Sequence, residues 1–261
     1  MKPARPSSAV ILIREVRRKI EIFMGQRHER ATFASAFVFP GGVISKDDHC
    51  VYLRCRGLRE DDANQILSVK SGGLDYYSAA IRELFEETGV LLAVDSNNHW
   101  ASDNVNSCPP LAETRISLRA GKLSWPKLLS NANLNLATNE LHYLGHWETP
   151  VTLNARFSTR FFLAELPPGQ KAQHDGEELV ASRWLEPGQA LSLHNTGDIE
   201  LPFPQMKNLE ILADFTTPEM LRNWAHNRWR EPIERIRPWI QEEQGKRQVI
   251  LPWEPNYPDN A

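Results

Sequence analysis

Cysteine is scarce in this chain, which has only Cys50, Cys55 and Cys108 among its 261 residues. An odd and small number of cysteines excludes the disulfide framework of a small secreted domain, and it favours reduced thiols and a cytoplasmic location. A basic surplus is also lacking, because 30 lysines and arginines stand against 33 aspartates and glutamates, for a net charge of −3. We therefore expect no nucleic-acid partner.

Long apolar runs are absent as well. No stretch approaches the roughly 18 apolar residues of a membrane-spanning helix, so we expect no membrane partner. The sequence has no GxGxxG or Walker-type loop, which leaves dinucleotide-binding and NTPase loops unsupported. With 41% hydrophobic residues, the chain can bury an ample core.

The most informative stretch is residues 82–90, which reads Arg-Glu-Leu-Phe-Glu-Glu-Thr-Gly-Val. Glu83, Glu86 and Glu87 are spaced i, i+3 and i+4, so a helix places them next to one another on one face. Such a face is either a solvated acidic surface or a site for a divalent cation. Because like charges at this spacing repel and hard cations take carboxylate oxygens, the pattern favours a cation. The opposite face is apolar and can be buried; it holds Tyr77, Ile81, Leu84, Phe85 and Thr88.

Hydrophobic patterning predicts strands and helices on both sides of this acidic helix. The acidic helix itself is expected to begin at Asp75 as its N-cap and to end at Gly89. We expect residues 237–261 to wrap the domain as an ordered tail. The predicted strands are 8–13, 20–24, 36–39, 90–94, 141–147, 160–166 and 178–184, and the other predicted helices are 58–69, 111–120, 125–129, 187–193, 209–215 and 219–229. This order predicts an α/β fold with a mixed sheet and helices on both of its faces.

Residues 39–42, Phe-Pro-Gly-Gly, and residues 82–90 together resemble the Nudix hydrolase box, G-x5-E-x7-R-E-U-x-E-E-x-G-U, where U is aliphatic. The second half matches at every specified position. In the first half, Asp48 stands where the box has a glutamate, and 33 residues separate it from Arg82 instead of seven. The resemblance therefore implies an insertion of about 26 residues inside the box loop.

The resemblance implies a Nudix-type α/β/α sandwich with a mixed β-sheet and extra C-terminal helices. We expect a single domain, 1–261, with residues 43–74 as the insertion and 200–261 as a helical C-terminal extension and tail. The flanking segments, among them Gly25-Gln26-Arg27, Thr149-Pro150 and residues 156–164, are similar to those of the coenzyme A diphosphatase-like branch.

The function implied by the resemblance is hydrolysis of a P–O–P linkage in a nucleoside diphosphate-X compound with Mg²⁺ or Mn²⁺ as cofactor. Within the branch, the substrate would be coenzyme A or acyl-CoA, giving 3′,5′-ADP and 4′-phosphopantetheine or its acyl form. The alternatives are NADH, ADP-ribose or another nucleotide as substrate. A non-catalytic nucleotide-binding module is a further alternative, because the first half of the box is interrupted.

The resemblance assigns catalytic roles to Arg82, Glu83, Glu86 and Glu87. The three glutamates would bind the metal, together with the backbone carbonyl of Gly41. Arg82 would orient a box glutamate, or pair with Glu86 on the same helix, or do both. The missing box glutamate would be replaced by Asp48 or by a carboxylate of the insertion, namely Glu60, Asp61 or Asp62.

The remaining candidates lie outside the box. Glu177 and Glu178 are either the general base or ordinary surface charges. Arg27 and Arg160 are candidates for phosphate binding, since a guanidinium matches phosphate oxygens, and Phe157 is a candidate for stacking on an adenine. We expect the insertion to form a substrate lid or a dimer contact, the latter in a homodimer.

Overall fold

An eight-stranded mixed sheet forms the centre of the computed structural model, which describes residues 3–29, 35–102, 110–243 and 246–258. The strand order is β10-β7-β8-β1-β2-β3, with β4 paired to β1 and β9 paired to β2. The β1–β8 and β10–β7 pairs are parallel and the other pairs are antiparallel. The strands are β1 (Arg5–Val16), β2 (Lys19–Arg27), β3 (Phe37–Val38), β4 (Gly41–Val43), β7 (His142–Glu148), β8 (Phe157–Glu165), β9 (Leu179–Leu185) and β10 (Arg235–Ile236).

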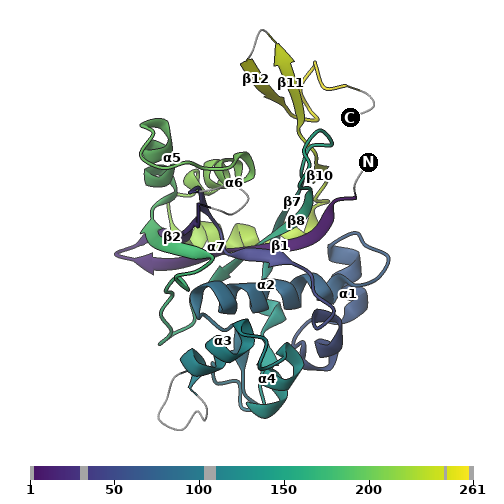
Figure 1. Ribbon diagram of the computed structural model, residues 1–261, viewed down its shortest axis with the longest axis vertical. Helices are drawn as coiled ribbons and strands as arrows, with labels where there is room; N and C mark the ends of the chain where they lie inside the picture. The colour runs from purple at the N-terminus through teal and green to yellow at the C-terminus, as the bar shows by residue number, and fades with distance from the viewer. Residues whose placement is uncertain (1–2, 30–34, 103–109, 244–245, 259–261) are drawn as a thin grey trace.

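Helices cover both faces of this sheet. Figure 1 shows α2 and its neighbours on one side of the sheet, with α5 and α6 on the other. The helices are α1 (Glu60–Ile66), α2 (Gly73–Thr88), α3 (Leu111–Arg119), α4 (Trp125–Asn131), α5 (Pro187–Asn195), α6 (Phe203–Ala213) and α7 (Pro218–Asn227). The predicted α/β class with a mixed sheet and helices on both faces is thus confirmed.

The alternation of side chains along β1 explains why two helical layers form. Val10 and Leu12 point to one face and share a core with Tyr77 and Leu84 of α2. Ile11 points to the opposite face, in a second core to which α5, α6 and α7 contribute. Because β1 is buried on both faces, it needs a helical layer on each side.

The insertion at residues 43–74 has secondary structure of its own. A 3-10 helix, η1 (Asp48–Arg54), is followed by α1, and both pack against α2. The predicted helix at 58–69 is therefore shorter than expected. Arg160 of β8 donates through Nη2 to the backbone oxygen of Leu67 at 3.3 Å, so the sheet holds the end of the insertion in place.

Two boundaries near the acidic helix differ from the prediction. The N-cap of α2 is Gly72, with a left-handed φ of 76°, and not Asp75. Asp75 lies in the first turn and accepts a hydrogen bond from the Tyr52 hydroxyl at 2.9 Å instead. The strand predicted at 90–94 shrinks to β5 (Ala93–Val94), which pairs with β6 (Asn135–Leu136).

The C-terminal extension, residues 200–261, is helical in its first part, and the segment expected as a tail contains a β-hairpin. Its first helix, α6, begins six residues earlier than expected, directly after Pro202. After α7 and two short 3-10 or strand segments, the chain forms an antiparallel hairpin of β11 (Trp239–Glu243) and β12 (Lys246–Ile250). Figure 1 shows this hairpin, in yellow, projecting beyond the end of the sheet that carries β7, β8 and β10. Two further 3-10 helices are η2 (Thr138–Glu140) and η3 (Arg228–Arg230).

Within the described ranges, no helix combines the length and the apolar character needed to cross a membrane.

Candidate functional site

Helix α2 presents its acidic face to the loop that joins β3 and β4. Glu87 is buried and its Oε2 accepts a hydrogen bond from the backbone nitrogen of Gly41 at 3.0 Å. Glu83 lies against Gly42, where a Cβ atom would come within 2.4 Å of the Glu83 carboxylate carbon. The paired glycines are therefore needed for the loop to approach the helix this closely.

Arg82 is held in place by an aspartate from the insertion. Its Nε donates to Asp48 Oδ1 at 3.1 Å and its Nη2 donates to Asp48 Oδ2 at 2.9 Å. Arg82 Nη1 donates to Glu83 at 2.7 Å and to Glu86 at 3.3 Å, and Nη2 also donates to the Val43 carbonyl at 3.0 Å. The contact expected with a box glutamate and the contact expected with Glu86 are both made by the Arg82 side chain.

A cavity of about 520 Å³ opens beside these carboxylates. Of the predicted site residues, Glu83, Glu86, Gly41, Arg27 and Phe157 line it, as does Glu178. Arg82 and Glu87 do not line the cavity and lie behind it.

Arg27 reaches this cavity from the end of β2. Its Nε is buried without a hydrogen-bond partner, and its charge lowers the pKa of Glu87, which burial raises. An unpaired buried guanidinium nitrogen beside a cavity is a donor that an anionic ligand can satisfy.

Two candidates lie outside the cavity. Arg160 sits on the face of β8 opposite to Phe157, Thr159 and Phe161, because successive side chains of a strand alternate in direction. It stacks over the Tyr76 ring at 4.1 Å and supports the insertion. Glu177 is exposed and pairs with Arg119 at 2.8 Å. The residues that line the cavity therefore include neither Arg160, expected to bind phosphate, nor Glu177, one of the two candidates for the base.

Burial and crowding change the acidity of the helix carboxylates. Burial raises the pKa of Glu83 to about 7, with Arg82 opposing the shift and Glu86 adding to it. Burial also raises the pKa of Glu86. Burial, followed by the charge of Glu83, raises the pKa of Glu87 well above its usual range. The charge of Glu178 contributes to all three shifts, which places it close to the acidic face.

The donor chemistry of this face fits a hard divalent cation. All candidate ligand atoms are oxygens, which Mg²⁺ and Mn²⁺ prefer. In the part of the chain that the structure describes, however, no three His, Cys, Asp or Glu side chains are gathered as a ready ligand group. Glu83 and Glu86 face the cavity, whereas Glu87 is directed to Gly41.

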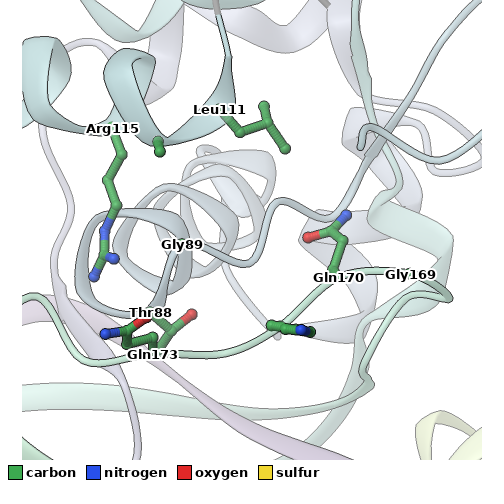
Figure 2. A pocket seen from close by; sticks show the side chains of 9 residues that line it. Thr88, Gly89, Leu111, Arg115, Gly169, Gln170 and Gln173 are labelled. Atoms are coloured by element: carbon green, nitrogen blue, oxygen red, sulfur yellow. The ribbon is translucent and has the colours of Figure 1, made fainter. Parts of the chain in front are cut away.

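A second cavity, of about 380 Å³, lies at the C-terminal end of α2 and shares no lining residue with the first. Figure 2 shows Arg115 reaching from α3 towards the turn that ends at Gly89. The Arg115 Nε donates to the backbone oxygen of Glu86 at 2.9 Å. A cation at this position complements the negative end of the helix and fixes the turn that carries Glu86.

Sequence reasoning did not anticipate several residues of the first cavity. Gln205 lines it, and its Oε1 is buried without a partner. Ile240 and Val249 reach it from the C-terminal hairpin. No local pattern in the sequence could place Ile240 and Val249 in the lining of the same cavity as Glu83, because their positions are set by tertiary structure.

Comparisons with known proteins identify the family of this chain. A family model described as NUDT19 Nudix domain matches residues 57–212, which is more than half of the chain. The acyl-coenzyme A diphosphatase NUDT19 of Xenopus laevis is 26% identical over 273 residues, covering 92% of this chain and 72% of that protein. The human protein of the same name is 29% identical over 168 residues, covering 62% of this chain and 45% of that protein.

A solved structure shows the same fold. The Nudix hydrolase from Alicyclobacillus acidocaldarius aligns with a TM-score of 0.71 and 24% identity, covering 85% of this chain and 97% of that one. The family model and the relatives, together with this fold, identify a hydrolase that acts on diphosphate anhydride bonds. The chain belongs to the Nudix hydrolase family, in the coenzyme A diphosphatase branch.

Proposed function

We propose that this protein hydrolyses the P–O–P linkage of coenzyme A or acyl-CoA with Mg²⁺ or Mn²⁺ as cofactor. The observation that carries the proposal is that Glu83, Glu86 and Glu178 line one cavity together with Arg27. Carboxylates that can hold cations, next to a guanidinium with an unpaired nitrogen, suit a charged diphosphate.

The metal would be held by Glu83, Glu86 and Glu87 and by the backbone carbonyl of Gly41. When bound, a divalent cation supplies charge neutralisation of the diphosphate and a lowered pKa for the attacking water. The three carboxylates, of which Glu87 is buried and the other two are partly buried, hold protons more tightly than usual when no cation offsets their charge. A bound cation would therefore strongly favour the charged form of these carboxylates.

Arg82 keeps the carboxylates in position. Its guanidinium donates to Glu83 and Glu86 and is itself fixed by Asp48. Because Asp48 is fully buried, the arrangement is rigid, and we assign Asp48 the place of the missing box glutamate.

Glu178 is our candidate for the general base. It lines the cavity and acts electrostatically on all three helix carboxylates. Its carboxylate would take the proton of the attacking water while the P–O bond to the leaving phosphate breaks. Arg27 would bind phosphate oxygens through its unpaired Nε.

The substrate assignment rests on relatives. Three of them carry the name acyl-coenzyme A diphosphatase, and the chain spans 72% of the Xenopus laevis protein, 45% of the human one and 68% of the Gallus gallus one. The products from this substrate would be 3′,5′-ADP and 4′-phosphopantetheine, or its acyl form.

An assay of the purified protein with Mg²⁺ or Mn²⁺ tests the proposal. Coenzyme A, octanoyl-CoA, NADH, ADP-ribose and a dinucleoside polyphosphate are compared at equal concentration, and the products are separated by chromatography. We expect the highest kcat/KM for a coenzyme A compound. Turnover of NADH or ADP-ribose alone would refute the substrate, and no turnover of any of the five would refute the proposal.

The alternative of a non-catalytic binding module loses its motivation, because Asp48 supplies the carboxylate for Arg82 that the interrupted box lacked. A cytoplasmic location and a homodimer stay predictions. Light scattering of the purified protein tests the second, with twice the mass of 29.8 kDa expected for a dimer.

A further inference from the structure

The cavity has two chemically different ends, and β1 runs between them. Near one end, Ala9 of β1 pairs with Gly41 in the loop that faces the acidic helix. Near the other end, Arg5 of β1 pairs with Phe157 of β8. Four residues of strand separate these points, which is about 13 Å at roughly 3.3 Å per residue. A ligand with its diphosphate at the carboxylates must therefore extend along β1 to reach the far end.

The far end is aliphatic and aromatic. Two of its side chains, Ile240 and Val249, lie opposite each other on the hairpin, so they share one face of it. Leu153 is 36% exposed, so part of its side chain is available for contact with an apolar ligand. The apolar lining residues at this end are Pro150, Leu153, Phe157, Pro238, Ile240 and Val249.

A cluster around Glu148 fixes the base of the hairpin. Glu148 Oε1 accepts from Arg156 at 2.7 Å and from Arg237 at 2.9 Å, and Oε2 accepts from Arg235 at 3.1 Å. Glu148 ends β7, whereas Arg235 and Arg237 directly precede the hairpin. Since an isolated two-stranded hairpin is marginally stable, the ion pairs of the buried Glu148 with Arg235 and Arg237 explain how the hairpin keeps its position beside the cavity.

The same cluster decides what the far end can accept. Glu148 also lines the cavity, but its two oxygens are already engaged by three guanidinium groups. Arg5 also lines this end, and its guanidinium lies over the Phe157 ring at 4.7 Å. The aliphatic and proline side chains, in contrast, offer no hydrogen-bond partner to the edge of a nucleobase. An unbranched hydrocarbon chain matches the wall formed by Ile240 and Val249 better than an adenine does, because it needs burial and no polar contacts.

We propose that the C-terminal hairpin, through Ile240 and Val249, forms the wall of a subsite for an acyl chain on the substrate. This inference rests on the proposed function, and it adds that the chain acts on acylated coenzyme A better than on the free compound. The hairpin is then a determinant of chain-length preference, because Ile240 and Val249 line the same cavity as Glu83 and Glu86.

The experiment compares kcat/KM for free coenzyme A, acetyl-CoA and octanoyl-CoA in three variants and the unaltered protein. For the unaltered protein, we expect kcat/KM for octanoyl-CoA to exceed that for acetyl-CoA by about tenfold, because added methylenes become buried. In Ile240→Asp, the ratio of the octanoyl to the free coenzyme A value should fall by about tenfold. Ile240→Leu should keep the ratio, because it keeps an aliphatic wall.

Gln248→Asp is the matched control. Gln248 pairs with Gln241 on the face of the hairpin opposite to Ile240, so the same charge there should leave the ratio unchanged. Two results overturn the hairpin subsite while the proposed hydrolysis of coenzyme A stands. One is an unaltered protein whose kcat/KM does not rise from acetyl-CoA to octanoyl-CoA, and the other is an equal fall of the octanoyl ratio in Ile240→Asp and Gln248→Asp. Hydrolysis of no coenzyme A compound at all overturns the proposed function and the subsite with it. Thermal unfolding of each variant identifies a folding defect, and in that case Ile240→Ser replaces Ile240→Asp.

Discussion

Asp48 and Arg82 form a two-point ion pair across 34 positions of sequence, with nitrogen–oxygen distances of 3.1 and 2.9 Å. Asp48 is fully buried and also accepts from the Ser45 backbone nitrogen and the Ser78 hydroxyl. Asp48 is the first residue of η1, so it is the start of the insertion that supplies the carboxylate bound to Arg82. The insertion lengthens the box loop without separating the partners that orient the acidic helix.

Replacing Asp48 by asparagine should lower kcat about 10- to 100-fold, which is the usual range for removing a group that orients metal ligands. An amide cannot accept from both Arg82 nitrogens, so Arg82 would be free to shift the carboxylates of Glu83 and Glu86. Steady-state kinetics at saturating Mg²⁺ measure this effect.

Asp61→Asn is the control for this substitution, because Asp61 lies exposed on α1 of the same insertion. It should leave kcat unchanged. Asp48→Glu should recover part of the loss, since it restores a two-oxygen acceptor. Equal activity in Asp48→Asn and Asp61→Asn would show that Asp48 has no part in orienting the site.

Replacing each of the two loop glycines by alanine should have different effects, with Gly41→Ala lowering stability and Gly42→Ala lowering activity. A Cβ at Gly41 would lie 2.2 Å from the backbone oxygen of Ser8, which the sheet holds in place, so Gly41→Ala should lower the melting temperature. The three atoms nearest to a Cβ at Gly42 all belong to the Glu83 carboxylate, the closest at 2.4 Å, and a side chain can move aside more easily than backbone. Gly42→Ala should therefore retain most of the stability and lose at least about tenfold in kcat, because Glu83 is displaced.

Calorimetry and kinetics on both variants test this difference. Gly188→Ala serves as the control, because a Cβ there meets no atom within 4 Å. The reverse pattern, with Gly42→Ala unstable and Gly41→Ala merely inactive, would contradict the packing of this loop on α2.

Much of the fold was predictable because its signals are local. The alternation of β1 and the apolar stripe of α2 define their buried faces within a dozen residues each. The N-cap of α2 was predicted wrongly because Asp75 is a good capping residue by type, whereas the chain enters the helix through the left-handed Gly72. The side chain of Asp75 is used by Tyr52 of the insertion instead.

The site was predictable only where the motif is continuous. Glu83, Glu86 and Glu87 follow from one helix, but the choice between Glu177 and Glu178 depends on which way each side chain points at the entry to β9. Glu177 turns outward to Arg119, and Glu178 lines the cavity. Arg160 lies on the face of β8 opposite to Phe157 and Phe161, and which of the two faces borders the cavity depends on tertiary packing that the sequence does not display.

Glu178→Gln should lower kcat by about 100-fold, because a glutamine cannot take the proton of the attacking water. Glu177→Gln, the neighbouring control, should leave kcat unchanged, since its carboxylate is exposed and bound to Arg119. Kinetics over a range of pH at saturating metal measure both. A full effect in Glu177→Gln with none in Glu178→Gln would reverse the assignment of the base.

Replacing Arg27 by alanine should raise KM at least about tenfold with a smaller change in kcat, because a phosphate-binding guanidinium is lost from the cavity. Arg27→Lys should recover little of this, since an ammonium cannot offer the same pair of donors. Arg18→Ala, in the exposed β1–β2 turn, is the control and should leave KM unchanged. A fall in kcat alone would instead give Arg27 a role in the chemical step.

Metal binding should be visible without any substrate. A cation that binds only the folded state stabilises it by about 2.7 kcal/mol at a concentration 100-fold above Kd. For a chain of this size, that corresponds to a rise of about 5–10 °C in melting temperature.

The rise should disappear in Glu83→Gln and in Glu87→Gln, and kcat should fall by well over tenfold in both. Glu113→Gln, on exposed α3 surface, should keep both the rise and the activity. An equal rise in melting temperature in all four proteins would show that the cation binds away from the acidic face. Glu83 and Glu87 belong to that face, where they contact Gly42 and Gly41, so their substitution must weaken a cation bound there.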